Sequence, residues 1–167
     1  MQSDCASVDF PSARAVLLHF WCDIVEFCPQ ESLAWLPNFA DFVTLCMKSE
    51  DGDVRRAACF GVGLCALTKL DAYADFVSKS LPTLFEACSI PNAKDPDHIY
   101  ATENAVSTIG KILAVFSSKA AANESLDLHG NWVGLLPITF DDDEFEFTYS
   151  YLMSWASQYA LKFFLIH

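Results

Sequence analysis

The sequence predicts an all-α fold of helix pairs stacked along one axis, an α-solenoid. Apolar residues recur at helical spacing along the chain, and no segment shows the strict alternation of a half-buried strand. A leucine–proline pair recurs within the predicted helix pairs, with Pro37 and Pro82 45 residues apart and Pro137 a further 55 residues on. A period in the forties with paired helices is typical of HEAT repeats, whose units bury their apolar faces only by stacking.

Seven helices are expected: a leading helix and then about three antiparallel pairs. Their predicted ranges are 11–28, 32–48, 53–69, 72–89, 97–118, 131–138 and 143–166. Pro11 suits a first helical turn, Pro29 ends the first helix, and Asp53 is the expected N-cap of the third. Helical glycine costs about 1 kcal/mol relative to alanine, so Gly61 and Gly63 are expected to have a packing reason. Residues 1–9 are expected to be a flexible amino end, and 10–167 a single solenoid segment.

The composition limits the kinds of partner. The 167 residues are 53% apolar and carry a net charge of −12, which allows a large core but disfavours nucleic acid and anionic membranes. Basic proteins are the natural electrostatic partners. The seven cysteines form no CxxC pair, so we expect reduced thiols and no metal site. No signal peptide or membrane span is predicted.

Catalytic motifs are missing from the sequence. The four histidines form no HExxH pattern, and there is no nucleophile elbow or phosphate loop. The carboxylates of residues 141–144 precede a helix, where the helix dipole favours negative charge, so they need no acid–base role. The sequence therefore predicts a protein that is not an enzyme and has no cofactor.

Three segments resemble the importin-beta superfamily of nuclear transport receptors. They are DVRRAACFGVG at 53–63, ATENAVSTIGKI at 101–112, and WVGLLP at 132–137 followed by an acidic run and FTYSYL at 147–152. The resemblance is to the branch of importin five and importin four and covers about residues 15–155. It places the chain in the carboxyl-terminal half of such a receptor.

The resemblance implies a function in nuclear import. Family members carry basic cargo of the ribosomal-protein or histone type between cytoplasm and nucleus, bind nucleoporins at the pore, and release cargo on binding Ran-GTP. The family's main Ran contacts lie in amino-terminal repeats, so this segment alone is not expected to bind Ran. A HEAT scaffold unrelated to transport is the alternative, and it would use apolar contacts with weak salt dependence.

Polar residues near the starts of the fifth and seventh helices are the candidate cargo-binding residues. They are Asp97, Glu103, Asn104, Asp141, Asp142, Asp143 and Glu144. On a helical projection, Asn104 and Lys111 fall nearly opposite the apolar stripe that contains Ile109. Asn104 could offer its amide to the backbone of an extended cargo segment. Alternatively, it ties down a turn between repeats or faces water.

Overall fold

A computed structural model describes residues 10–120 and 127–166, so the predicted flexible end at 1–9 lies outside the described residues. Helices and connecting turns make up the described part, which contains no strand, and the all-α prediction is confirmed. The elements are α1 Pro11–Phe27, α2 Pro29–Ser32, α3 Leu36–Cys46, α4 Gly52–Leu67, a 3-10 turn Asp71–Tyr73, α5 Ala74–Cys88, α6 Ile99–Ala120, α7 Leu128–Val133 and α8 Asp142–Ile166.

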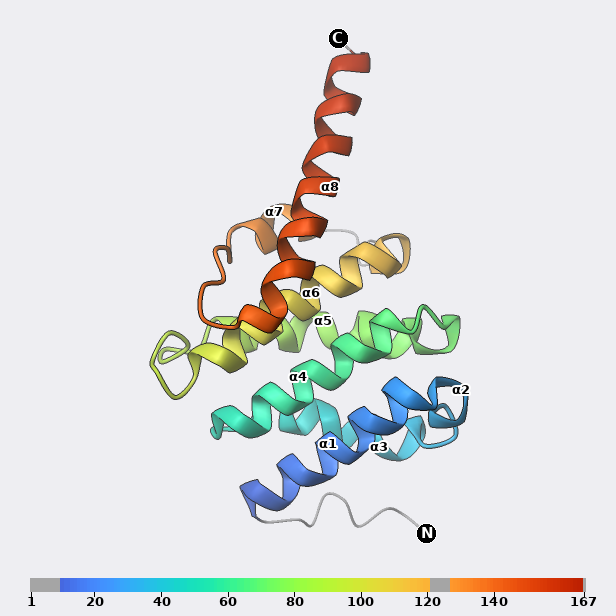
Figure 1. Cartoon of the computed structure of the whole chain (residues 1–167), viewed down its shortest axis with the longest axis vertical. Coiled ribbons are helices and arrows are strands. Elements are labelled where there is room, and N and C mark those ends of the chain that lie inside the picture. The colour runs from blue at the N-terminus through green and yellow to red at the C-terminus, as the bar shows by residue number, and fades with distance from the viewer. Residues whose placement is uncertain (1–9, 121–126, 167) are drawn as a thin grey trace.

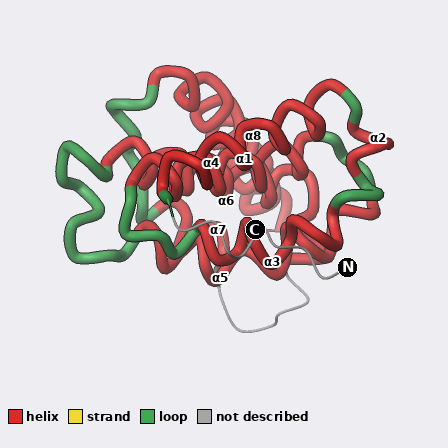
Figure 2. The backbone as a smooth tube through the Cα atoms, turned by 90° about the horizontal axis from the view of Figure 1, so that it is seen from below, coloured by secondary structure: helices red, strands yellow, loops and turns green. Residues whose placement is uncertain are grey.

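The helices form two layers (Figure 1). One layer contains α1, α4, α6 and the start of α8, and the other contains α3, α5 and α7. Figure 2 shows the same two layers from the end of the stack. A leading helix is thus followed by the pairs α3–α4, α5–α6 and α7–α8, which confirms the predicted solenoid. The carboxyl-terminal half of α8 extends beyond the body of the molecule (Figure 1).

The core runs continuously through the stack and depends on close helix approach. Trp21 of α1 is fully buried and stacks on Phe39 of α3, with ring centroids 5.8 Å apart. A Cβ added at Gly61 would lie 2.6 Å from the Trp21 ring, and one at Gly63 would lie 2.7 Å from the Thr108 hydroxyl. Both glycines therefore have the packing reason that the sequence indicated.

Several element bounds differ from those expected. The predicted helix 32–48 is divided, with the short α2 before Leu33 and α3 beginning at Leu36. The N-cap of α4 is Asp51, whose side chain accepts from the Val54 N–H at 3.0 Å, and the expectation of Asp53 was wrong. The predicted helix 131–138 lies earlier, as α7, because Leu136 precedes a proline and is disfavoured in helical backbone.

Burial keeps the core cysteines protonated. It raises the pKa of the Cys22 and Cys59 thiols to about 12 and that of Cys46 to about 11. Such thiols behave as small apolar side chains rather than nucleophiles.

Among the described residues, no helix combines the length and hydropathy that crossing a bilayer requires.

The joint between α7 and α8 is built around His129. Its ring stacks on Trp155, with centroids 5.2 Å apart and planes inclined by 7°, and its Nε2 lies 2.9 Å from the Tyr151 hydroxyl. Partial burial lowers the pKa of His129 from its usual 6.5, although Asp127 acts in the opposite direction. The neutral imidazole is therefore the form that the folded joint prefers.

We expect the free energy of unfolding to fall between pH 7 and pH 5 in a way that depends on His129. The pKa of this histidine is lower in the folded chain than in the unfolded one, so the unfolded chain binds the additional proton first. Stability from this group is present above the unfolded pKa and is lost as the pH falls through that window. Urea unfolding at both pH values should show a smaller loss for His129→Gln. An equal loss in the two proteins would contradict the assignment.

Candidate functional site

The starts of α4, α6 and α8 lie along one edge of the layer that these helices share (Figure 1). An acidic turn precedes or opens each helix: Asp51 and Asp53 at α4, Asp97 before α6, and 141–144 at α8. Carboxylates at these positions are favoured by the partial positive charge of the helix amino ends. We call the surface formed by α1, α4, α6 and the start of α8 the acidic face.

Glu103 of α6 is buried, with 3% of its surface exposed. Its carboxylate accepts three backbone N–H groups, from Thr139 at 2.7 Å, Phe140 at 2.7 Å and Asp141 at 2.8 Å. Charge-assisted bonds of this kind are stronger than neutral ones. Glu103 therefore fixes the loop that leads into α8, and the structure gives it a partner within the chain.

Glu144 joins α8 to α6 through a buried polar network. Its carboxylate accepts from Asn104 Nδ2 at 3.1 Å, Ser107 Oγ at 2.5 Å and Lys111 Nζ at 2.5 Å. The Lys111 and Glu144 side chains are only 6% and 5% exposed. The three α6 residues are spaced three and four apart, which places them on one line of the helix surface. In the sequence, this spacing of three polar residues was the signal that α6 could bind one carboxylate from a neighbouring helix.

Asp141 is also occupied within the chain. Its Oδ2 lies 3.0 Å from the Arg56 guanidinium, which in turn lies over the Tyr100 ring at 5.2 Å. Burial raises the pKa of Asp141, and the Arg56 charge lowers it. The exposed candidates are Asp97, Asp142 and Asp143.

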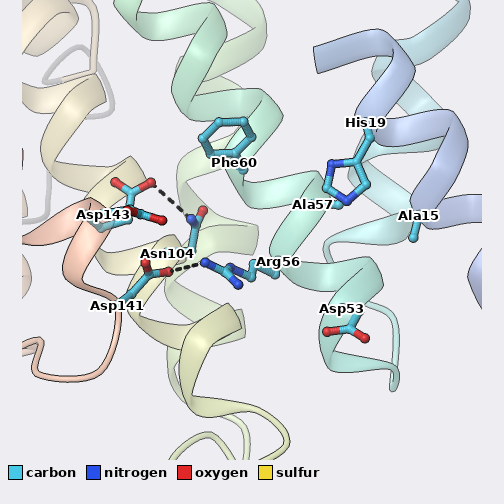
Figure 3. A pocket seen from close by; sticks show the side chains of 10 residues that line it. Ala15, His19, Asp53, Arg56, Ala57, Phe60, Asn104, Asp141 and Asp143 are labelled. Atoms are coloured by element: carbon cyan, nitrogen blue, oxygen red, sulfur yellow. Dashed lines mark hydrogen bonds and ion pairs between the residues drawn. The ribbon is translucent and has the colours of Figure 1, made fainter. Parts of the chain in front are cut away.

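A cavity of about 480 Å³ opens on the acidic face between α1, α4, α6 and α8 (Figure 3). Four candidates line it, namely Asn104, Asp141, Asp143 and Glu144, while Asp97 lies in a neighbouring hollow beside Glu50 and Tyr100. The remaining lining residues are Ala15, His19, Asp53, Arg56, Ala57 and Phe60. None of these was singled out from the sequence as a binding residue, because they come from α1 and α4 and only the fold brings them to α6.

The carboxylates of the site are not grouped as metal ligands in the described part of the chain. Within the described residues, no set of three histidine, cysteine or acidic side chains is arranged to hold a metal ion. The carboxylates are paired with cations, bound to backbone amides or exposed at a helix start. This arrangement can bind cations and N–H donors.

The described residues thus form a HEAT-repeat solenoid with one acidic face. No protein-family model matches the chain. It is 29% identical over 130 residues to importin subunit beta-3 of Saccharomyces cerevisiae, a match that covers 78% of this chain and 12% of that protein.

Two solved structures support the same resemblance. The crystal structure of Kap121p bound to RanGTP superposes with a TM-score of 0.74 at 28% identity, covering 84% of this chain and 13% of that one. Kap121p bound to Ste12p gives a TM-score of 0.69 at 29% identity, covering 81% and 12%. The resemblance to the importin-beta superfamily is thus confirmed. These relatives are transport receptors rather than enzymes, which confirms the non-enzymatic prediction.

Proposed function

We propose that the chain is a segment of a nuclear import receptor and that its acidic face binds basic cargo. The observation that carries this proposal is the alignment of three acidic helix starts on one face of a chain with net charge −12. The chain spans about one eighth of the length of the relatives it matches. Kap121p has been crystallised with both RanGTP and Ste12p, which supports partner binding by receptors of this kind.

Within the proposal, the six carboxylates among the seven candidate residues have two different tasks. Asp97, Asp142 and Asp143 are exposed and supply negative potential to an approaching segment. Glu103, Asp141 and Glu144 are buried and have partners in the chain, so they shape the face rather than contact cargo directly. Transport of ribosomal-protein or histone-type cargo, nucleoporin binding and shuttling between cytoplasm and nucleus belong to the proposed whole receptor, which would also bind Ran-GTP.

The test is the salt dependence of binding to an unfolded basic peptide rich in lysine. Electrostatic complementarity predicts that the affinity measured by calorimetry falls by about tenfold between 50 and 300 mM NaCl. A peptide of the same length rich in glutamate is the control and should not bind.

Binding that persists at high salt would favour the alternative, a HEAT scaffold that uses apolar contacts. The observation in its favour is the set of exposed apolar side chains on the outer helices. Phe20 and Phe27 of α1 are 60% and 74% exposed, and Met153 and Tyr159 of α8 are 66% and 63% exposed.

A further inference from the structure

Asn104 lines the cavity of the acidic face, and its side chain contains a buried acceptor that has no partner. Its Nδ2 donates to Glu144, but its Oδ1 has no hydrogen-bond partner, although the residue is 98% buried. The amide cannot be reversed, because the Glu144 carboxylate only accepts and would repel the oxygen. A buried acceptor left unpaired costs about 1–3 kcal/mol, so this oxygen favours a ligand that donates an N–H. In Figure 3 the amide nitrogen is turned toward α8, and the oxygen lies on the side of Phe60.

The charges around the cavity favour a cation. Asp141 is paired with Arg56, and Glu144 with Lys111. Asp53 and Asp143 line the cavity from opposite sides, one at the start of α4 and one in the first turn of α8, and both are exposed. Asp53 and Asp143 are thus two exposed carboxylates of the lining in addition to Asp141 and Glu144, which are paired with arginine and lysine.

Apart from His19 of α1, the remaining lining residues are apolar. Ala15 of α1 and Ala57 and Phe60 of α4 contribute carbon surface, and the half-buried Phe60 ring already lies 5.9 Å from the ammonium of Lys111. An aromatic face of this kind attracts a cation, and small apolar residues leave room for a methylene stem. The volume of about 480 Å³ exceeds that of one side chain and leaves space for the backbone that carries it.

We propose that this cavity binds the side chain of one lysine in an extended segment of a bound protein. The stem lies along Ala15, Ala57 and Phe60, and the ammonium donates to Asn104 Oδ1 while it faces Asp53 and Asp143. Lysine fits better than arginine, because a compact ammonium with three divergent donors can serve one amide oxygen and two carboxylates on different walls. The inference rests on the proposed function and assigns one part of the acidic face to one side chain.

The experiment uses the ¹⁵N-labelled chain and a capped glycine–serine peptide with a single central lysine. Titration should shift the Asn104 side-chain NH₂ and the Phe60 backbone amide signals, and the same peptide with norleucine should shift neither. Asp143→Asn and Asp53→Asn should each weaken the lysine peptide by about three- to fivefold. Glu146→Gln is the control, because it removes one exposed carboxylate from α8 outside the cavity and outside the candidate residues, and it should leave the affinity unchanged. Thermal melts of all variants confirm that they remain folded.

The outcomes distinguish a lysine site in the cavity from diffuse binding by the whole acidic face. Equal weakening by Glu146→Gln and Asp143→Asn would overturn the cavity site and leave a diffuse acidic face intact. An arginine peptide that binds as tightly as the lysine peptide would overturn the lysine assignment. If only long basic peptides bind, and Asn104 does not shift, the single-residue site is also overturned. If no basic peptide binds at all, the proposed function fails together with it.

Discussion

Replacing Lys111 with methionine is expected to destabilise the chain by about 3–5 kcal/mol. Its ammonium forms an ion pair with the Glu144 carboxylate, and both side chains are almost completely buried. Methionine fills a similar volume but leaves the carboxylate with Asn104 and Ser107 alone. Urea unfolding followed by circular dichroism measures the loss.

Two further variants show whether the loss comes from the uncompensated charge. Lys111→Met combined with Glu144→Gln should recover about half of the stability or more, because the amide keeps an acceptor for α6 without a buried charge. Lys48→Met is the control for an exposed pair, since Lys48 and Glu86 are 55% and 65% exposed, and should cost less than about 1 kcal/mol. A loss for Lys111→Met no larger than that of Lys48→Met would contradict a buried network.

The helices were predictable because their signals are local. Apolar spacing, prolines near helix starts and acidic turns before α4, α6 and α8 all act within a few residues. The bounds of α2, α3 and α7 were less accurate, since the turns around them depend on tertiary packing. The Asp51 cap was missed for a similar reason, because both Asp51 and Asp53 are suitable cap residues and the sequence does not say which backbone turns first.

The site was predictable only in part, because a helical projection assumes one buried side. In the structure, α6 contacts α4 and α5 as well as α7 and α8, so residues placed opposite the apolar stripe are buried too. Asn104 and Lys111 are 2% and 5% exposed, and their partner Glu144 lies more than 30 residues along the chain. Residue type and spacing correctly indicated that α6 contributes to the site. The residues of α1, α4 and α8 that surround α6 could not be predicted, because only the stacking of repeats brings them there.

Replacing Glu103 with glutamine should destabilise the chain by about 3 kcal/mol and loosen the loop before α8. The carboxylate satisfies the N–H groups of residues 139–141, whereas an amide offers one oxygen and turns its own NH₂ toward the remaining donors. Hydrogen exchange of these three amides should become faster, and urea unfolding should show the loss of stability. Glu146→Gln, on the exposed surface of α8, is the matched control and should change neither.

The same variant distinguishes a structural role of Glu103 from the cargo contact that the sequence predicted for it. If Glu103 acts by fixing the loop, its replacement lowers stability first, and any effect on a basic peptide follows from the displaced Asp141 and Asp143. If Glu103 instead contacts cargo, peptide affinity falls while exchange at 139–141 and the free energy of unfolding stay at their original values. The three short bonds to backbone amides favour the first outcome, because a carboxylate that is 3% exposed would have to break them before it could reach a ligand.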